Sequence, residues 1–433
     1  MTMAQAVNIH VPRVLAWNKH HDPVQNPVRS PYILMEDVKG TTLDRPHDYF
    51  QRSKAINKLP DKVIEGMVKQ MVPSLSRLGS IYFAEDFPSS SPLLVPGQVA
   101  ANDSEMQPVA DKLRIGPIAD MLWWRPFHDE PHLDRGPWDT LEDCVRAAVL
   151  IERRAIERHR ADPSSLAYTR STLNDLDTIE RLLNKVDILA PHLQHAIERA
   201  SPCPERFTQN VFVHPDICPE NVMIPPSTSE NVVEDMLHPV MIDWENTVVL
   251  PFAIQFYKPS LVIFEPCSLV PGPTGWTSVR ESSAPSDAPW PDYDEMSPEI
   301  RQVTRAAMLP NLRALLPLVL RACADGPAGL WWTLARIKVL WDRDQHIYGP
   351  CPLTFEPEEM GQAQRAMDEL QDEVEVSELL ATRLGCSWEG FVEEEDDYEE
   401  ALRELENAKK DWDKDAPGQL FPFREGGYAD FLR

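Results

Sequence analysis

Three short apolar runs separated by polar residues lie between residues 212 and 242. The loop after the first run carries His214, Asp216 and Asn221 in the order H-x-D-x4-N, and the second run follows Asn221 directly. Runs this short between polar loops are typical of buried strands, which hold loop side chains at the rim of a core. The third run leads into Ile242-Asp243-Trp244-Glu245. The pattern predicts a small sheet whose loops present a histidine, an asparagine and two aspartates.

These residue types suit phosphoryl transfer, in which a protein mainly positions an acceptor hydroxyl and neutralises charge. Asp216 would accept or orient the hydroxyl proton, and His214 would anchor the loop. Asn221 and Asp243 carry hard oxygen atoms of the kind that Mg²⁺ prefers. The alternative is that these residues cap turns and line up by chance, as H-x-D-x4-N does in on the order of a few per cent of chains of this size. The flanking apolar runs favour the functional interpretation.

The rest of the chain is mostly helical in pattern. Apolar residues at three- and four-residue spacings predict helices over Lys54–Leu78 with a bend near Pro73, from Asp139 or Thr140 to about Arg160, over Ser171–Ala200 with an interruption at Pro191, and within 300–345 and 357–415. Short apolar runs predict two strands, around Val11–Leu15 and Tyr32–Met35. Residues 86–110 and 270–298 are rich in Pro and Ser and predict loops. Together these elements predict an α+β fold.

Charge and hydropathy exclude several classes of function. The chain has 69 acidic and 42 basic residues, a net charge of −27, which disfavours nucleic acids and anionic membranes as partners. The longest apolar stretch, Leu309–Leu320, is interrupted by two prolines and an arginine, so no membrane span is expected. The N-terminal residues show no targeting pattern, which predicts a cytoplasmic location. Seven cysteines without a C-x-x-C pair favour reduced thiols.

The segment from Val11 to about Phe256 resembles the aminoglycoside phosphotransferase-like branch of the protein-kinase-like fold. More narrowly, it resembles the fungal relatives grouped with the altered-inheritance-of-mitochondria protein family. The matching residues are Val11–Trp17, Pro31–Glu36 with Gly40, Leu78–Phe83, Arg135–Trp138, the His214 loop, and Ile242–Glu245 followed by Val248, Leu250 and Pro251. The resemblance implies a remnant N-lobe and hinge over 1–40, a mostly helical C-lobe over 41–350 and a charged helical extension over 351–433.

The resemblance also implies roles for the site residues. Asp216 would be the catalytic base beside His214, and Asn221 and Asp243 would hold Mg²⁺. The acceptor would be a small hydroxyl compound that fold analogy does not identify. A mitochondrial location, as in the resembled family, is the alternative to a cytoplasmic one if the chain has a further N-terminal segment.

The nucleotide would be ATP, bound at the hinge. By the resemblance, the backbone around Glu36 and Val38 would meet the adenine, with Met35 at the edge of the adenine pocket. Met35 is equally expected as an ordinary core methionine.

One part of the family pattern is missing. In this fold a Gly-rich loop and a strand lysine, which hold the phosphates, precede the hinge. The ten residues MTMAQAVNIH hold neither, and Lys19 and Lys39 lie in polar turns. Either the chain is a fragment, or it is a remnant kinase fold that acts as a non-catalytic binding module. Because single phosphate-stabilising donors are typically worth about 2.7–4 kcal/mol, we expect weak or absent transfer. The remaining N-lobe strands are expected to be the least stable part of the chain, with an exposed edge.

Other features have simpler interpretations. The pairs Trp123-Trp124 and Trp331-Trp332 could stack on a ligand, but core packing is the more usual role of paired aromatics. The histidines and arginines between Gly116 and Trp138 could belong to an acceptor-side insertion. Cys218 could be a nucleophile, but a packing role is favoured because no His/Asn pair accompanies it in the sequence.

Overall fold

The structure is a computed structural model that describes residues 1–42, 73–87, 91–94, 106–125, 128, 130, 132–162, 175–224, 239–255, 267–272, 275–280, 306, 308–384 and 395–415. The chain divides into two compact units. Unit 1 contains Met1–Asp120, Arg135–Cys144 and His192–Arg313, and unit 2 contains Met121–Asp134, Val145–Pro191 and Ala314–Arg433. The resemblance predicts three consecutive segments instead, and that division stays a prediction.

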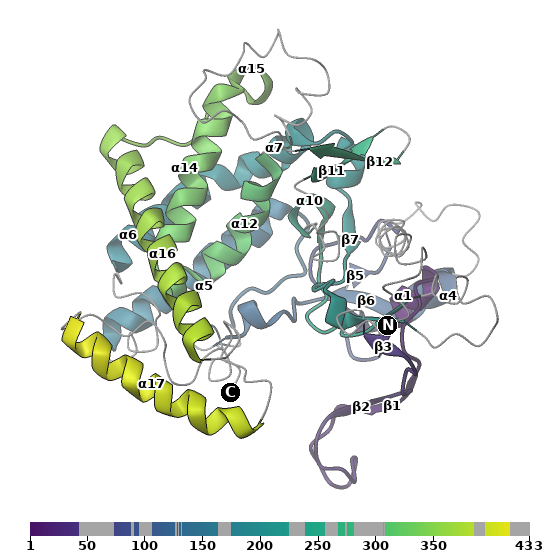
Figure 1. Ribbon diagram of the computed structural model, residues 1–433. Coiled ribbons are helices and arrows are strands. Elements are labelled where there is room, and N and C mark those ends of the chain that lie inside the picture. Colours follow the sequence, from purple (N-terminus) through teal and green to yellow (C-terminus); the bar gives the residue numbers. More distant parts are fainter. Residues whose placement is uncertain are drawn as a thin grey trace. The chain divides into compact units, whose positions relative to one another are not determined.

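Unit 1 contains all the described strands, paired into small antiparallel sheets (Figure 1). Their orders are β1 (Val14–Asn18) with β2 (Tyr32–Met35); β4 (Ser80–Phe83), β6 (Leu113–Gly116) and β5 (Ser91–Pro92); β3 (Thr41–Thr42), β8 (Val222–Ile224) and β9 (Val240–Met241); β10 (Val249–Pro251) with β7 (Asn210–Phe212); and β11 (Cys267–Gly272) with β12 (Gly275–Arg280). Its short helices are α1 (Thr2–Ala6), α4 (Met106–Lys112), α7 (Leu193–Ala200), α8 (Pro204–Phe207) and α10 (Phe252–Gln255). The predicted α+β class is confirmed.

The first eleven residues pack in the core of unit 1. Their buried side chains are Met3, Ala4, Val7, Ile9 and Val11, in one cluster with Ile115, Val222, Met241 and Val249. The main chain joins the same core, because Met241 N–H donates to the His10 carbonyl oxygen at 2.9 Å. Each large apolar side chain buried in this way contributes about 1.5–3 kcal/mol. The segment expected to be a loose remnant is therefore part of the core up to Val11.

The β1–β2 hairpin is different, because no residue of either strand is buried. Its register pairs Val14 with Met35 and Trp17 with Ile33, with an irregularity between Val14 and Ala16. Trp17 stacks on Phe83 of β4 at 5.5 Å between ring centroids. Figure 1 shows the hairpin extending away from the other strands of unit 1. The two predicted strands are confirmed, and in addition their side chains are exposed or half-buried.

A close backbone approach at Gly79 joins two sheets of unit 1. Gly79 N–H donates to the Val249 carbonyl oxygen at 3.1 Å, and its own carbonyl accepts from Val249 N–H at 2.7 Å. A Cβ atom at position 79 would lie 2.2 Å from the Gly116 carbonyl oxygen, far inside van der Waals contact. Glycine is therefore the residue that lets β4, β6 and β10 meet here.

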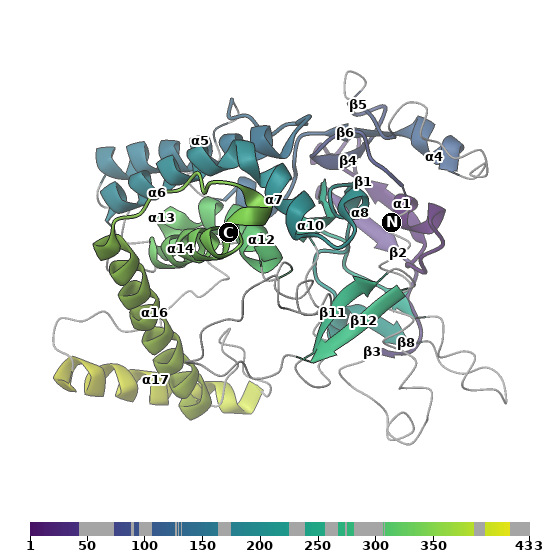
Figure 2. The ribbon, with the colours of Figure 1, turned by 90° about the horizontal axis from the view of Figure 1, so that it is seen from above.

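Unit 2 is helical. It holds η2 (Met121–Trp123), α6 (Leu176–Leu189), α13 (Ala322–Asp325), α14 (Ala328–Arg343), α15 (Gln345–Tyr348), α16 (Pro357–Leu384), α17 (Glu395–Asp415) and most of α5 (Leu141–Ala161) and α12 (Met308–Leu320). Helix α14 packs against α6, α13 and α16. Helices α5 and α6 lie side by side (Figure 2), with Arg153 and Asp187 paired at 2.7 Å. Among the described residues, no helix has both the length and the apolar composition that a membrane span requires.

Most of the predicted helices are confirmed. Asp143 N–H donates to Thr140 Oγ1 at 3.1 Å, so Thr140 caps the start of α5 as expected. Helix α6 and helix α7 are separated by a 3₁₀ turn, η4 (Ala190–His192), at the predicted interruption near Pro191. Proline lacks a backbone N–H and breaks the helical hydrogen-bond pattern there.

Three predictions of secondary structure need correction. The helix expected over Lys54–Leu78 lies mostly outside the described residues, and its end is wrong because Leu75 and Leu78 form β-bridges. Residues 86–110 were expected to be a loop but include β5 and the start of α4. The region 270–298 includes the end of β11 and all of β12, which pair with each other; residues 273–274 and 281–298 lie outside the described part of the chain.

Candidate functional site

The predicted catalytic loop lies between β7 and β8 and includes a 3₁₀ turn, η5 (Pro219–Asn221). Its ends are held by the flanking strands, because β7 pairs with β10 and β8 with β3 and β9. Asp216 is exposed, and Asn221 is half-buried. The three predicted loop residues therefore lie between two fixed strand ends.

His214 joins this loop to the segment that carries Asp243. Its side chain is 1% exposed, its Nε2–H donates to the Ile242 carbonyl oxygen at 2.7 Å, and its Nδ1 accepts from Asp216 N–H at 3.2 Å. Burial lowers the pKa of His214, against smaller opposing effects of the Ile242 carbonyl and of Asp216 and Asp243. Both ring nitrogens are engaged with main-chain atoms, so the imidazole connects the two segments and is not available as a base or a metal ligand.

A second bond joins the same segments, since Ile242 N–H donates to the Asn221 carbonyl oxygen at 3.0 Å. The Asn221 side-chain amide donates to the Asp216 carbonyl oxygen at 3.0 Å and to Asp216 Oδ2 at 3.3 Å. Because Nδ2 is engaged with Asp216, the orientation of the amide group is set by that residue. Asp216 and Asn221 are thus brought together by direct contacts.

Asp243 follows β9 at a sharp change of chain direction. Its φ angle is 61°, in the left-handed region, which Asp and Asn tolerate better than most residues. Its side chain is exposed. The next residue fixes the turn, because Trp244 Nε1–H donates to the Met241 carbonyl oxygen at 3.0 Å and the indole lies edge-on to His214 at 4.7 Å between ring centroids. The backbone of Asp243 is therefore held while its carboxylate faces solvent.

The predicted Mg²⁺ ligands, Asn221 and Asp243, form a small set of oxygen donors. Among the described residues, no group of three or more His, Cys, Asp and Glu side chains is arranged to hold a metal. The predicted set is instead one carboxylate and one amide oxygen, Asp243 Oδ and Asn221 Oδ1. A Mg²⁺ ion held together with substrate phosphates characteristically uses only one or two protein ligands and keeps several waters. The chemistry of the pair fits such a shared ion and does not fit a protein-enclosed cage.

The predicted hinge residues follow β2 toward β3. Met35 is exposed, so the ordinary core role considered for it does not apply. Glu36 N–H donates to the Arg13 carbonyl oxygen at 2.9 Å, and Val38 is half-buried. Strand β3 then pairs with β8, placing Thr42 opposite Met223. The chain after Val38 thus runs into the sheet that contains β8, the strand that directly follows Asn221.

Cys218 lies in the same loop, and its surroundings disfavour the thiolate form. Burial, together with Glu220, raises the pKa of its thiol to about 12. A thiol needs a lowered pKa to react at neutral pH. The packing role predicted for Cys218 is the better description.

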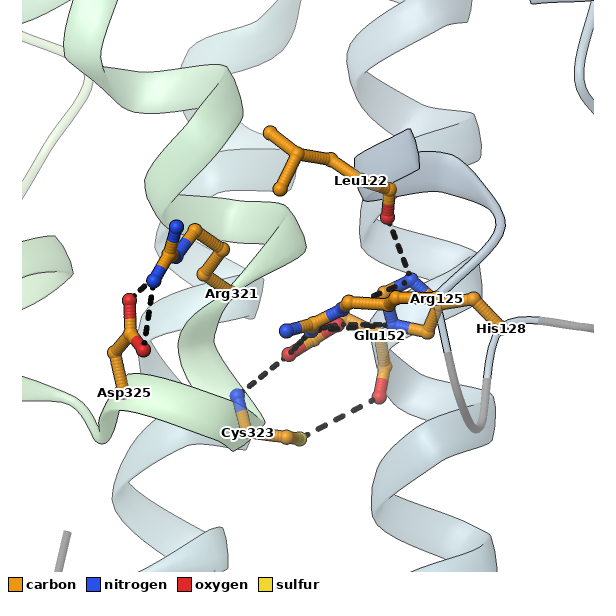
Figure 3. Close-up of polar contacts among 7 residues, drawn as sticks. All are labelled: Leu122, Arg125, His128, Glu152, Arg321, Cys323 and Asp325. Carbon is orange, nitrogen blue, oxygen red and sulfur yellow. Dashed lines mark hydrogen bonds and ion pairs between the residues drawn. The ribbon is translucent and has the colours of Figure 1, made fainter. Parts of the chain in front are cut away.

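A second polar cluster lies in unit 2, and its central residue, Glu152, was missed by the sequence analysis (Figure 3). Glu152 of α5 is fully buried and accepts from Arg125 Nη2 at 3.1 and 3.0 Å and from Cys323 N–H at 2.5 Å. His128 Nε2 lies 2.8 Å from Glu152 Oε2, and His128 Nδ1 lies 3.1 Å from the Leu122 carbonyl oxygen. Burial alone would raise the pKa of Glu152, but Arg125 and His128 outweigh it and lower the pKa to about 2.

This cluster is a structural centre of unit 2. It holds the turn after η2 and the start of α13 against α5, with every partner drawn from the protein itself (Figure 3). Two of the residues suggested for an acceptor-side insertion, Arg125 and His128, are therefore used for packing. Amphipathic periodicity could not reveal Glu152, because a glutamate in a helix is ordinarily expected on the solvent face.

The tryptophan pairs divide between core and surface. Trp123 and Trp331 are buried, whereas Trp124 is 46% exposed and Trp332 is half-buried against Arg336. The core role is thus confirmed for the buried member of each pair.

Comparison with known proteins identifies fungal relatives. The chain is 26% identical over 276 residues to altered inheritance of mitochondria protein 9, mitochondrial, of Clavispora lusitaniae. The aligned region covers 61% of this chain and 42% of the relative. The protein of that name from Lachancea thermotolerans is 26% identical over 281 residues (60% and 42%), and that from Saccharomyces cerevisiae RM11-1a is 23% identical over 269 residues (58% and 40%).

The chain spans about two fifths of the length of these relatives. No family model matches it, and no solved structure matches it. The predicted similarity to the fungal mitochondrial-inheritance proteins is therefore confirmed. The protein-kinase-like fold stays a prediction.

Proposed function

We propose that unit 1 is the catalytic-loop half of a protein-kinase-like phosphotransferase that binds Mg²⁺ and ATP. The observation that supports this proposal is a pair of hydrogen bonds that join the Asp216 loop to the segment that contains Asp243. His214 bonds the Ile242 carbonyl, and Ile242 N–H bonds the Asn221 carbonyl. Residues far apart in sequence are thus held in one place, as a shared metal and nucleotide site requires.

Each residue has a distinct role in this proposal. Asn221 and Asp243 hold Mg²⁺, and Asp216 orients or accepts the proton of a small-molecule hydroxyl. A bound metal ion would neutralise charge on the phosphates. His214 and Trp244 keep the two segments in register without touching the reactants. The adenine lies against the backbone at Glu36 and Val38, beside Met35.

A second candidate function is nucleotide binding without efficient transfer. The observation that favours it concerns the two lysines nearest the hinge. Lys19 pairs with Asp86 and Lys39 with Asp37, and both lysine side chains are largely exposed. Ion pairs of this kind hold these lysines away from the role of a phosphate-binding lysine in a buried strand. In this case the chain acts as a pseudokinase-like binding module.

The relatives support a cellular context for either function. Their names assign them to mitochondria and to mitochondrial inheritance. We propose the same location for this protein, in place of the cytoplasmic location predicted from its N-terminal residues. The proposal does not specify which small hydroxyl compound accepts the phosphate.

Thermal unfolding with Mg²⁺ and ATP tests the site. A ligand at 100 times its dissociation constant adds about 2.7 kcal/mol of stability, so wild-type protein should unfold at a higher temperature only when both are present. Asp243→Asn should abolish this shift. Glu245→Gln, which changes an exposed carboxylate two residues away, is the matched control and should keep it. The proposal would be rejected if Mg²⁺–ATP did not raise the unfolding temperature of the wild-type protein. It would also be rejected if the ligand raised that of Asp243→Asn by the same amount as in the wild type.

Transfer separates the two candidates. The γ-phosphate of radiolabelled ATP should appear on an added hydroxyl compound, or as inorganic phosphate, at a rate that depends on Asp216 if the first candidate is correct. Asp216→Asn should then lower the rate while the thermal shift persists. Binding with no release of γ-phosphate in the wild-type protein would select the binding module.

A further inference from the structure

The β1–β2 hairpin exposes an unusual amount of apolar surface. Its exposed apolar strand residues are Val14, Leu15, Trp17, Ile33, Leu34 and Met35, which we call the hairpin surface. Ile33 is 65% exposed and Leu34 54% exposed, and consecutive strand residues point to opposite faces. Both faces of the hairpin therefore carry exposed apolar side chains, although Trp17 also stacks on Phe83 of β4. Contiguous apolar surface of this kind commonly marks an interaction site.

The two strand edges of the hairpin differ. The irregularity between Val14 and Ala16 disrupts β1, and irregularities of this kind protect an edge from pairing. Strand β2 pairs regularly with β1 and, among the described strands, with no other. Its sequence Tyr32-Ile33-Leu34-Met35 contains no charge and no proline. Strand β2 thus lacks the devices by which proteins usually block an edge.

The net charge of the hairpin favours a second copy of the same chain as the partner that covers the hairpin surface. The whole chain carries −27, so two copies repel over most of their surfaces. Residues 11–39 are an exception, with four basic residues against three acidic ones and a net charge of +1. A partner selected by charge, such as a strongly basic or acidic surface, finds no complement here. A second hairpin of the same kind does, because it is equally apolar and equally neutral.

We infer that the hairpin is a self-association surface, through which two copies of the chain pair antiparallel along their β2 strands. A twofold contact of this type is self-complementary and closes as a dimer. It converts two marginal hairpins into one four-stranded sheet, and three or more strands are needed for independent stability. Paired β2 strands would also bring the exposed Ile33 and Leu34 side chains of the two copies beside one another on the two faces of that sheet, where apolar cross-strand pairs add stability.

Sedimentation of the full chain from low to high micromolar concentration tests this inference. Wild-type protein should change from monomer to dimer. Ile33→Lys and Leu34→Lys place a charge on opposite faces of β2, and each should raise the dissociation constant by at least about tenfold. Val24→Lys is the matched control, because Val24 is 89% exposed in the turn of the same hairpin, and it should dimerise like the wild type. Far-UV circular dichroism of each variant confirms that the hairpin changes leave the fold intact.

Hydrogen exchange supplies a second readout. The amides of Ile33, Leu34 and Met35 should become more protected as concentration rises, whereas those of Val222 and Met223 in β8 should not change. A wild-type monomer at all concentrations would overturn the inference. So would a dimer that both lysine substitutions leave intact, or one that Val24→Lys weakens equally. None of these measurements uses nucleotide, so the result is independent of the proposed phosphotransferase site.

Discussion

Two sets of carboxylates in this molecule have opposite surroundings. Glu152 in unit 2 is fully buried, and its oxygens accept from Arg125, His128 and the Cys323 amide. Asp216 and Asp243 in unit 1 are exposed at the ends of short strands. A buried carboxylate with protein partners on both oxygens stabilises a fold, whereas an exposed carboxylate on a fixed backbone can still take a ligand. The acid with the most strongly shifted pKa is therefore not the candidate for chemistry here.

The buried polar group at the candidate site of unit 1 is a histidine whose pKa is lowered by burial. His214 bonds main-chain atoms on both sides of the site, which fixes the backbone and leaves the nearby aspartates at the surface. In unit 2 the buried contacts of Glu152 compensate a charge, whereas in unit 1 those of His214 hold two backbone segments in position. The predictions below test this difference, starting with the largest expected effect.

Removal of the Glu152 charge should give the largest loss of stability. Glu152→Gln leaves Arg125 without its buried anionic partner, and breaking a buried pair in this way costs about 3–5 kcal/mol. Urea unfolding followed by circular dichroism measures the change. Glu157→Gln, on the exposed face of the same helix, removes a surface pair with Arg154 and should cost at most about 1 kcal/mol. Equal effects of the two substitutions would remove the distinction between the units.

Acid should weaken the wild-type protein through the same residue. The folded-state pKa of Glu152 is about 2, below its ordinary value of 4.5, so the stability it contributes is present above about pH 4.5 and is lost as pH falls toward 2. The full contribution corresponds to about 3 kcal/mol. The free energy of unfolding, measured from about pH 5 to pH 2, should fall less steeply in Glu152→Gln. Superimposable slopes would show that Glu152 does not keep its charge on folding.

An intermediate effect is expected at His214. His214→Ala removes the bonds to the Ile242 carbonyl and the Asp216 amide and should cost about 1–3 kcal/mol. The same change should weaken the response to Mg²⁺–ATP, because it releases the Asp216 loop from the Asp243 segment. His21→Ala, at an exposed position in the hairpin turn, should alter neither property. Nucleotide binding that survives His214→Ala undiminished would show that the link is unnecessary.

The smallest stability effects are expected for the exposed aspartates. Asp216→Asn and Asp243→Asn should each change the free energy of unfolding by no more than about 0.5 kcal/mol, as is usual for surface substitutions. Chemical denaturation without ligand measures both. A large loss for either variant would show that its carboxylate has a structural role like that of Glu152.

The local order of the candidate site could be predicted from sequence. Short apolar runs around His214, Asp216 and Asn221 predict strand ends, and β7 and β8 lie there. The capping of α5 by Thr140 and the break near Pro191 were also predictable, because each depends on residues within a few positions.

What could not be predicted depends on contacts between distant residues. Nothing local pairs Glu152 with Cys323, 171 positions away, or indicates that Met3 and Val7 fill the core beside β8 and β9. The Pro- and Gly-containing sequence around residue 272 predicts a loop, yet β11 and β12 pair with each other there. Periodicity reports which face of an element is apolar and leaves its partner undetermined.

Calorimetric titration of Mg²⁺–ATP into three proteins tests the central claim most directly. At a temperature where all three are folded, wild-type and Glu152→Gln proteins should bind with similar affinity, and Asp243→Asn should show no saturable heat. That result would assign ligand binding to the exposed carboxylates of unit 1 and stability to the buried one of unit 2. Equal binding by Asp243→Asn and the wild type, or no binding by the wild type, would contradict the account.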